Sequence, residues 1–182
     1  MRAMLLVACL AASAETGRAQ VGAERSAPPK RLAYTEPRFP AEAREVRPAL
    51  QGIVILELTL NEEGRPVDVK ILRAIPLLDR AAVAAAQQWR YEPTLVDGVP
   101  ARVVVEEIVD MFPDKDSRAT YWADMLSKRT GDPLYRVLAA QRLESIGVRK
   151  KRVIETLQKA TTDADPRVQA AASRALETLE RP

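Results

Sequence analysis

The stretch that decides the fold covers residues 52–60 and reads GIVILELTL. Its apolar side chains recur at every second position, the period that places side chains on one face of a β-strand. A glycine-containing turn sequence, residues 61–64, separates it from a second alternating run, so the two runs predict an antiparallel hairpin. The residues expected to face the core are Val54, Leu56, Leu58 and Leu60 in the first run and Val67, Val69 and Ile71 in the second.

Two helices and one more strand are predicted around this hairpin. Residues 40–45 begin with proline at a first-turn position and continue with good helix formers, which predicts a short helix. A second helix is predicted from Pro76 onward. Its stripe toward the sheet consists of Leu78, Ala82, Ala85 and Trp89. Residues 102–112 are a third β-branched run, so the order predicts an α+β fold with a small three-stranded antiparallel sheet and two helices on one face.

From residue 114 onward the apolar spacing is helical throughout. Asp132-Pro133 and Asp165-Pro166 start two similar segments, each with an N-cap aspartate followed by proline. The two segments are offset by 33 residues. An internal repeat with this period is typical of stacked helical pairs. Residues 165–179 follow the pattern D-P-x-V-x-x-A-A-x-x-A-L-x-x-L, which resembles HEAT repeats. That resemblance implies an all-α segment of HEAT-like helical repeats over residues 114–182.

The composition argues against catalysis. The 182 residues contain no histidine and a single cysteine, Cys9. Histidine-based acid/base relays, Ser-His-Asp and Cys-His nucleophile systems and Cys/His metal sites therefore lack their parts. Glu106 and Glu107 are neighbours in a strand and point to opposite faces, so they cannot form a catalytic dyad. We expect a protein that is not an enzyme, with no catalytic residues, no metal site and no cofactor.

The charge pattern argues against nucleic acid as a partner. The formal net charge is +3, and a nucleic-acid-binding protein normally gathers its basic excess into a patch with stacking aromatics. The densest basic run, residues 149–152, lies beside Glu144 and Glu155 and is interpreted as a solvated helix start. We therefore expect protein partners and no nucleic acid.

Residues 1–20 are interpreted as a signal peptide. Arg2 precedes an apolar run at residues 3–12, and small residues follow it. As a helix, that run would span only about 15 Å, half of a bilayer core of about 30 Å, so it predicts export rather than a membrane-spanning anchor. Residues 21–30 contain glycine, serine and paired prolines, which predicts a flexible lead-in.

One alternative concerns the cysteine in this signal. The sequence LVAC at residues 6–9 resembles a bacterial lipobox, whose cysteine is lipidated after cleavage. In that case, Cys9 carries a lipid anchor, and contact with a membrane runs through this anchor only. In the other interpretation, Cys9 is discarded together with the signal peptide.

A series of short motifs spans residues 37–100. The motifs are PRFPAEAR at 37–44, QG at 51–52, GRPVDV at 64–69, LDRAA at 78–82, AQQWRYEP at 86–93 and GVP at 98–100. In order and spacing, the series resembles the C-terminal domain of the TonB family. The resemblance assigns residues 31–113 to a TonB C-terminal-like domain, which precedes the helical segment at 114–182.

The resemblance implies a protein-binding function. In the TonB family, this domain links an energised inner-membrane complex to outer-membrane receptors and holds a receptor's extended segment by adding it to the sheet. In this chain, the run from Val103 to Val109 is the best candidate for such an edge strand. The predicted partner-binding residues are Pro37, Phe39, Pro40, Val103, Val105 and Glu107.

The chain also departs from the family. A complete transducer has an N-terminal transmembrane helix with a functional histidine and then a long spacer, whereas this chain has no histidine and a short lead-in. The resemblance therefore implies a periplasmic TonB-like binding module in transmembrane transport, with outer-membrane TonB-dependent receptors as the partners it suggests. The alternative is an envelope scaffold or regulatory protein, in which the HEAT-like helices bind the partner and no transport is driven.

Overall fold

The computed structural model describes residues 29–46, 50–128 and 132–181. The chain divides into two compact units, one up to Met111 and one from Phe112 onward, and each is described by itself. The predicted signal peptide with Cys9, and most of the predicted lead-in, lie outside the described residues. Within the described ranges, every helix is too short or too polar to cross a membrane.

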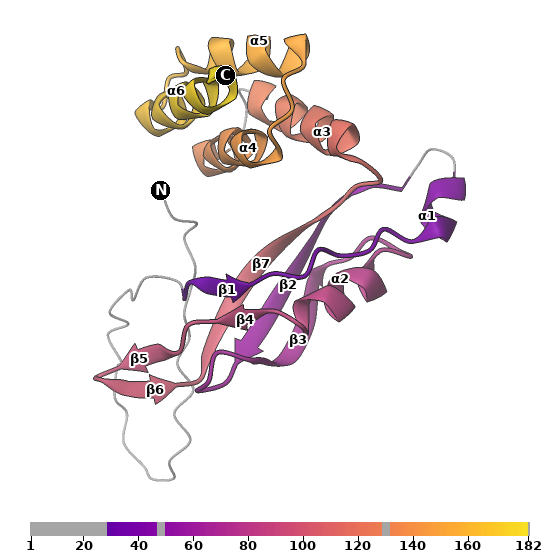
Figure 1. Cartoon of the computed structure of the whole chain (residues 1–182), viewed down its shortest axis with the longest axis vertical. Coiled ribbons are helices and arrows are strands. Elements are labelled where there is room, and N and C mark those ends of the chain that lie inside the picture. The colour runs from indigo at the N-terminus through magenta and orange to yellow at the C-terminus, as the bar shows by residue number, and fades with distance from the viewer. Residues whose placement is uncertain (1–28, 47–49, 129–131, 182) are drawn as a thin grey trace. The chain divides into compact units, whose positions relative to one another are not determined.

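A three-stranded antiparallel sheet forms the body of the first unit, as the alternating runs predict. Its strands are β2 (Gly52–Leu60), β3 (Pro66–Arg73) and β7 (Val103–Met111). The order across the sheet is β3-β2-β7, so β2 is the central strand (Figure 1). The predicted hairpin of β2 and β3 is confirmed, and β7 pairs with β2 along all of its length.

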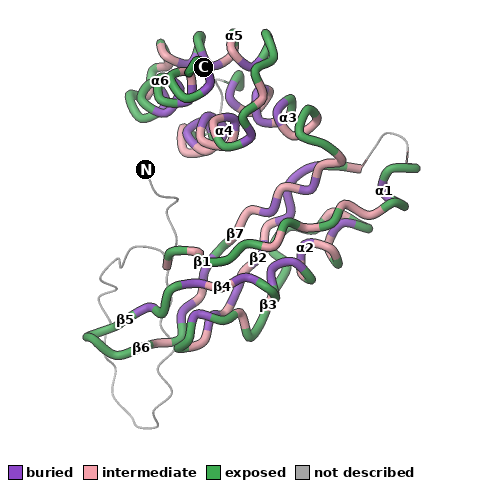
Figure 2. The backbone as a smooth tube through the Cα atoms, in the orientation of Figure 1, coloured by how far each residue is buried: buried purple, intermediate pink, exposed green. Residues whose placement is uncertain are grey.

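The core lies on the face of the sheet that α2 (Asp79–Ala86) covers, and the buried positions follow the central strands in Figure 2. The four residues of β2 predicted to face inward are at most 1% exposed: Val54, Leu56, Leu58 and Leu60. The predicted stripe of Leu78, Ala82, Ala85 and Trp89 is buried as well. The helix ends before Trp89, which enters the core from the segment that follows. The other predicted helix, α1 (Ala41–Glu45), contributes Ala43 to the same core.

The outer strand β3 departs from the prediction. The alternation places Val67 and Ile71 toward the core, but their side chains are 54% and 39% exposed. Val69, which pairs with Leu58 of the central strand, does pack against the core. Among the described strands, β3 has a neighbour on one side only. One-sided pairing alone does not explain this exposure, because β7 also has a single described neighbour and its inward residues are buried. Val67 is the extra residue at a register shift, between the pairs Leu60–Pro66 and Thr59–Asp68, so the alternation is interrupted there.

Two short strand pairs are absent from the sequence prediction. They are β1 (Arg31–Ala33) with β4 (Arg90–Tyr91), and β5 (Thr94–Val96) with β6 (Val99–Ala101). Strands of two or three residues are too short for a period to be recognised. The turn between β5 and β6 is formed by Asp97 and Gly98, whose φ values are 52° and 80°. Positive φ at both central residues is characteristic of a type I′ hairpin turn.

The turn between β2 and β3 packs closely against the segment after α2. Gly64 has a φ of 73°, and its carbonyl oxygen accepts the backbone N–H of Tyr91 at 2.9 Å. A Cβ atom added at Gly64 would lie 2.1 Å from the Tyr91 carbonyl oxygen. This position therefore requires glycine both for its backbone conformation and for the space it leaves.

Four helices are described in the second unit. They are α3 (Lys115–Ser127), α4 (Pro133–Ile146), α5 (Lys151–Ala160) and α6 (Pro166–Glu180). α3 packs on α4 and α5, and α6 packs on the same two helices. The predicted N-caps are present: Asp132 accepts the backbone N–H of Leu134, and Asp165 accepts that of Arg167. The helical segment is confirmed, and its assignment to HEAT-like repeats stays a prediction.

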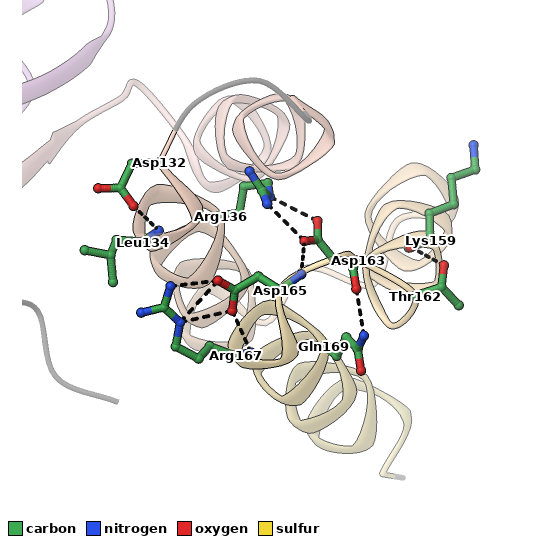
Figure 3. A network of polar contacts seen from close by, with 9 residues as sticks. All are labelled: Asp132, Leu134, Arg136, Lys159, Thr162, Asp163, Asp165, Arg167 and Gln169. Carbon is green, nitrogen blue, oxygen red and sulfur yellow. Dashed lines mark hydrogen bonds and ion pairs between the residues drawn. The ribbon is translucent and has the colours of Figure 1, made fainter.

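A buried ion pair joins α4 to the loop before α6 (Figure 3). Arg136 donates from Nε and Nη2 to the two carboxylate oxygens of Asp163, at 3.0 and 2.9 Å. The two side chains are only 8% and 10% exposed. Asp163 also accepts the backbone N–H of Asp165 at 2.9 Å, so the same carboxylate shapes the turn in which α6 begins. The hydrogen bonds from Arg136 hold the pKa of Asp163 below its usual range.

Candidate functional site

The candidate site is the first half of β7, at the edge of the sheet. β7 pairs with β2 on one side, and no described strand pairs with its other side. The stretch from Val103 to Glu107 therefore carries backbone N–H and C=O groups along a sheet edge. These are the groups that bind an extended segment when it joins a sheet as a further strand.

The side chains of β7 alternate between the two faces of the sheet. Those that face inward, with the core residues of β2, are Val103, Val105, Glu107, Val109 and Met111. Those that face outward are Val104, Glu106, Ile108 and Asp110. Val103 and Val105 are 1% and 2% exposed, so a partner can reach these two predicted residues only through their backbone. Val104 and Glu106 are not among the predicted residues, although the alternation that buries Val103 and Val105 also turns them outward.

Glu107 is held by two groups of its own chain. The Tyr91 hydroxyl donates to its Oε1 at 2.9 Å, and Arg31 donates from Nη1 to its Oε2 at 3.3 Å. The guanidinium carbon of Arg31 lies 4.6 Å from the ring centroid of Tyr34 and 4.8 Å from that of Trp89. At such distances an aromatic face attracts a cation. Burial, with the nearby Glu107 carboxylate, raises the pKa of Tyr91, so its hydroxyl stays protonated and serves as the donor.

The same contacts fasten residues 30–35, which we call the strap, onto the domain. β1 lies within the strap and pairs with β4, and the indole Nε1 of Trp89 donates to the carbonyl oxygen of Thr35 at 2.8 Å. Glu107 therefore connects the edge strand to the strap. Both carboxylate oxygens of Glu107 already accept hydrogen bonds. Glu107 would therefore attract a positive side chain of a partner only weakly.

A row of charged side chains crosses the outward face of the sheet. By strand register, Lys70 lies opposite Glu57, and Glu57 lies opposite Glu106. The Lys70 Nζ atom is 3.5 Å from Oε1 of Glu57, whereas no described residue forms an ion pair with the exposed Glu106. Carboxylates directly opposite each other on adjacent strands repel. From β3 to the β7 edge, the row is thus positive, negative, negative.

The predicted residues before α1 have structural contacts. Pro40 is the N-cap residue of α1, and Phe39 is partly buried against the core. The Arg44 guanidinium carbon lies 5.6 Å from the Phe39 ring centroid. Pro37 is of intermediate burial. In the described part of the chain, no hydrogen bond or ion pair connects these prolines or Phe39 to β7.

Residues 35–109 match the family of the Gram-negative bacterial TonB protein C-terminal. Protein TonB of Vibrio cholerae serotype O1 is 33% identical over 70 residues, which cover 37% of this chain and 28% of that protein. Protein TonB of Escherichia coli is 32% identical over 83 residues, which cover 44% of this chain and 32% of that protein. This chain thus matches less than a third of the length of either relative.

The matched residues contain the edge strand of the candidate site, whereas β1 with Arg31 lies just before them. They contain the β2–β3 hairpin, α2 and all but the last two residues of β7. The short motifs at residues 37–100 fall in the same range. The chain therefore contains a TonB C-terminal domain, at residues 35–109.

Proposed function

We propose that this domain binds an extended segment of a partner protein by strand addition along Val103–Glu107, in a TonB-like role in transport. The observation that carries the proposal is the position of β7 at the sheet edge, with β2 as its one described neighbour. Backbone groups along such an edge give affinity for an extended segment, and alternating side chains fix its register.

Strand addition at this edge requires no rearrangement of the core. The inward side chains of Val103 and Val105 are already buried in the core cluster, so a fourth strand would extend the existing sheet. Its inward side chains would lie next to Glu107 and the strap, and its outward side chains next to Val104 and Glu106. Two different surfaces would therefore select the side chains of the partner.

The family suggests the finer parts of the proposal. The relatives are named TonB, which favours outer-membrane receptors as partners and the periplasm as the location. In this proposal the protein acts as a binding module rather than as an enzyme. A lipid on Cys9 would supply the contact with a membrane.

Photo-crosslinking in the full chain tests this proposal. One variant carries a photoreactive amino acid at Val104, on the outward face of β7, and a matched variant carries it at Asp68, on the same face of the outer strand β3. The expected result is that envelope preparations yield a receptor adduct from position 104 and not from position 68. Equal adducts from both positions, or none from position 104, would count against strand addition at β7.

A second candidate function rests on the helical unit. This unit is compact by itself and lies outside the matched residues 35–109. In this candidate, the helices bind the partner, and the TonB C-terminal domain serves as a scaffold without driving transport. A third crosslinker at Ala170, an exposed residue of α6, separates the two functions. Adducts from position 170 alone would favour the second candidate.

A further inference from the structure

We propose that the strand added to β7 carries a lysine or an arginine beside Glu106, on the outward face of the sheet. The inference rests on the proposed function, because it concerns the segment that joins this edge. It adds the chemistry of that segment: an extended stretch of a partner protein with a positive side chain at one defined position.

The charge row across the sheet gives the reason. An added strand places one outward residue next to Glu106, as the fourth member of the row that begins with Lys70 and Glu57. Lys70 is already the cation of Glu57, so Glu106 faces a carboxylate on one side and the open edge on the other. A cation in the fourth place gives each carboxylate its own positive partner and offsets the repulsion between Glu57 and Glu106.

The apolar residues beside Glu106 favour a long side chain over a small cation. Val104 and Ile108 stand two positions away on the same outward face, and both are only partly buried. The methylene groups of a lysine or arginine can cover such apolar surface while the charged end reaches a carboxylate. The site therefore fits a protein side chain presented by a neighbouring strand.

Glu107, the adjacent carboxylate, should not select a positive side chain in the partner as Glu106 does. Tyr91 and Arg31 already donate to its two oxygens. Because side chains alternate along a strand, an inward residue of the added segment meets Glu107 and an outward residue meets Glu106. The preference for positive charge is thus confined to outward positions of the added segment.

Fluorescence anisotropy with the full chain tests the inference. The probes are fluorescein-labelled nine-residue peptides of alternating threonine and valine, in which lysine, norleucine or glutamate replaces each position in turn. We expect lysine at one position to tighten binding about two- to fivefold relative to norleucine, the range of an exposed cross-strand ion pair. Glutamate at that position should weaken binding by a similar factor. Both effects should shrink as salt is raised.

Two variants locate the effect. Glu106→Gln should abolish the difference between the lysine and norleucine peptides. Asp68→Asn is the matched control, because it removes a carboxylate from the same face at the opposite edge of the sheet, and it should leave the difference intact.

The outcomes distinguish the inference from the function on which it rests. If the unsubstituted peptide binds but lysine gives no advantage, or if the advantage survives Glu106→Gln, the inference is overturned and strand addition stands. If no peptide binds the chain at all, strand addition at this edge fails and the inference falls with it.

Discussion

Replacing Arg136 by methionine should destabilise the helical unit far more than the same replacement of Arg174. Methionine keeps an unbranched apolar stem but removes the guanidinium that donates to both oxygens of Asp163. The Asp163 side chain is 10% exposed, so little water can replace the lost hydrogen bonds. Arg174 pairs with Glu144 at 3.3 Å, but their side chains are 52% and 24% exposed.

The two replacements should lower the free energy of unfolding by different amounts, because the Arg136 pair is buried and the Arg174 pair is exposed. Removing one partner of a buried ion pair costs about 3–5 kcal/mol, which agrees with two hydrogen bonds to charged groups at about 1.5–3 kcal/mol each. An exposed pair contributes about 0–1 kcal/mol. The comparison is matched, since Arg136 reaches from α4 toward the start of α6 and Arg174 reaches from α6 to Glu144 of α4.

Hydrogen exchange followed by mass spectrometry measures both variants in the full chain. The method resolves the two units separately, which matters because compact units can open independently. A loss of about 3 kcal/mol corresponds to roughly 100-fold faster exchange of amides that open with the helical unit. Peptides from β2 in the same sample should keep their exchange rates and serve as the internal reference.

A double-mutant cycle completes the test. Arg136→Met combined with Asp163→Asn should be less destabilised than the sum of the single variants, with a coupling energy of about 2 kcal/mol or more. If Arg136→Met and Arg174→Met both accelerate exchange by less than tenfold, the assignment of a stabilising role to the buried pair is refuted.

Three other positions give predictions of their own. Gly64→Ala should destabilise the first unit by about 3 kcal/mol or more, because its Cβ would meet the Tyr91 carbonyl oxygen at 2.1 Å; the urea midpoint from tryptophan fluorescence measures this. Asp165→Asn should lower stability at neutral pH but not below about pH 2: Arg167 lowers the pKa of Asp165 from 3.8 to about 2, so its contribution is present above the ordinary value and is lost as pH falls through the lowered one. Urea unfolding by circular dichroism between about pH 1 and pH 7 measures this difference. Arg31→Met should accelerate hydrogen exchange in the strap about tenfold, since it removes an ion pair and two ring contacts.

Each of these changes has a control. Gly98→Ala tests the backbone conformation alone, because φ there is 80° and nothing lies within 4 Å of the added Cβ; it should cost only about 1–2 kcal/mol, and equal midpoints for both alanine variants would contradict the close approach at Gly64. Asp68→Asn removes a carboxylate from the first unit, so the helical unit should keep its pH profile. Lys30→Met changes a side chain that is 74% exposed and should leave exchange in the strap nearly unchanged. Unchanged exchange in Arg31→Met as well would mean that the guanidinium does not hold the strap.

The elements that could be predicted are those whose signal is local. The period-two run of β2 predicts both its strand and its buried face, because the inward residues of this strand pack within the core. Asp132 and Asp165 predict helix starts, because a capping carboxylate acts on backbone groups two or three residues away. The same period overestimates the burial of β3, since alternation marks a face and says nothing about what covers it.

The contacts that escaped prediction connect distant residues. Arg31 and Glu107 are 76 positions apart, and no local pattern brings a guanidinium from the strap to the edge strand. The pairing of Arg136 with Asp163 spans 27 positions and likewise depends on how the helices pack. For the candidate site, the sequence located the strand and its alternation, but that Glu106 lies opposite Glu57, and Glu57 opposite Lys70, became evident only with the register of the strands.

The strap would yield before the sheet if the domain were pulled from its N-terminal side. Tension applied from the N-terminal side reaches residues 30–35 first, where β1 is held by a two-point register with β4 and by the hydrogen bond from the Glu92 N–H to the Lys30 carbonyl. The nine paired positions between β2 and β7 are a much longer ladder. Peeling of the strap would release about 20 Å of slack before that ladder bears force. Because Arg31 leaves with the strap, pulling would also remove the cation of Glu107 and leave two uncompensated carboxylates, Glu106 and Glu107, on the edge.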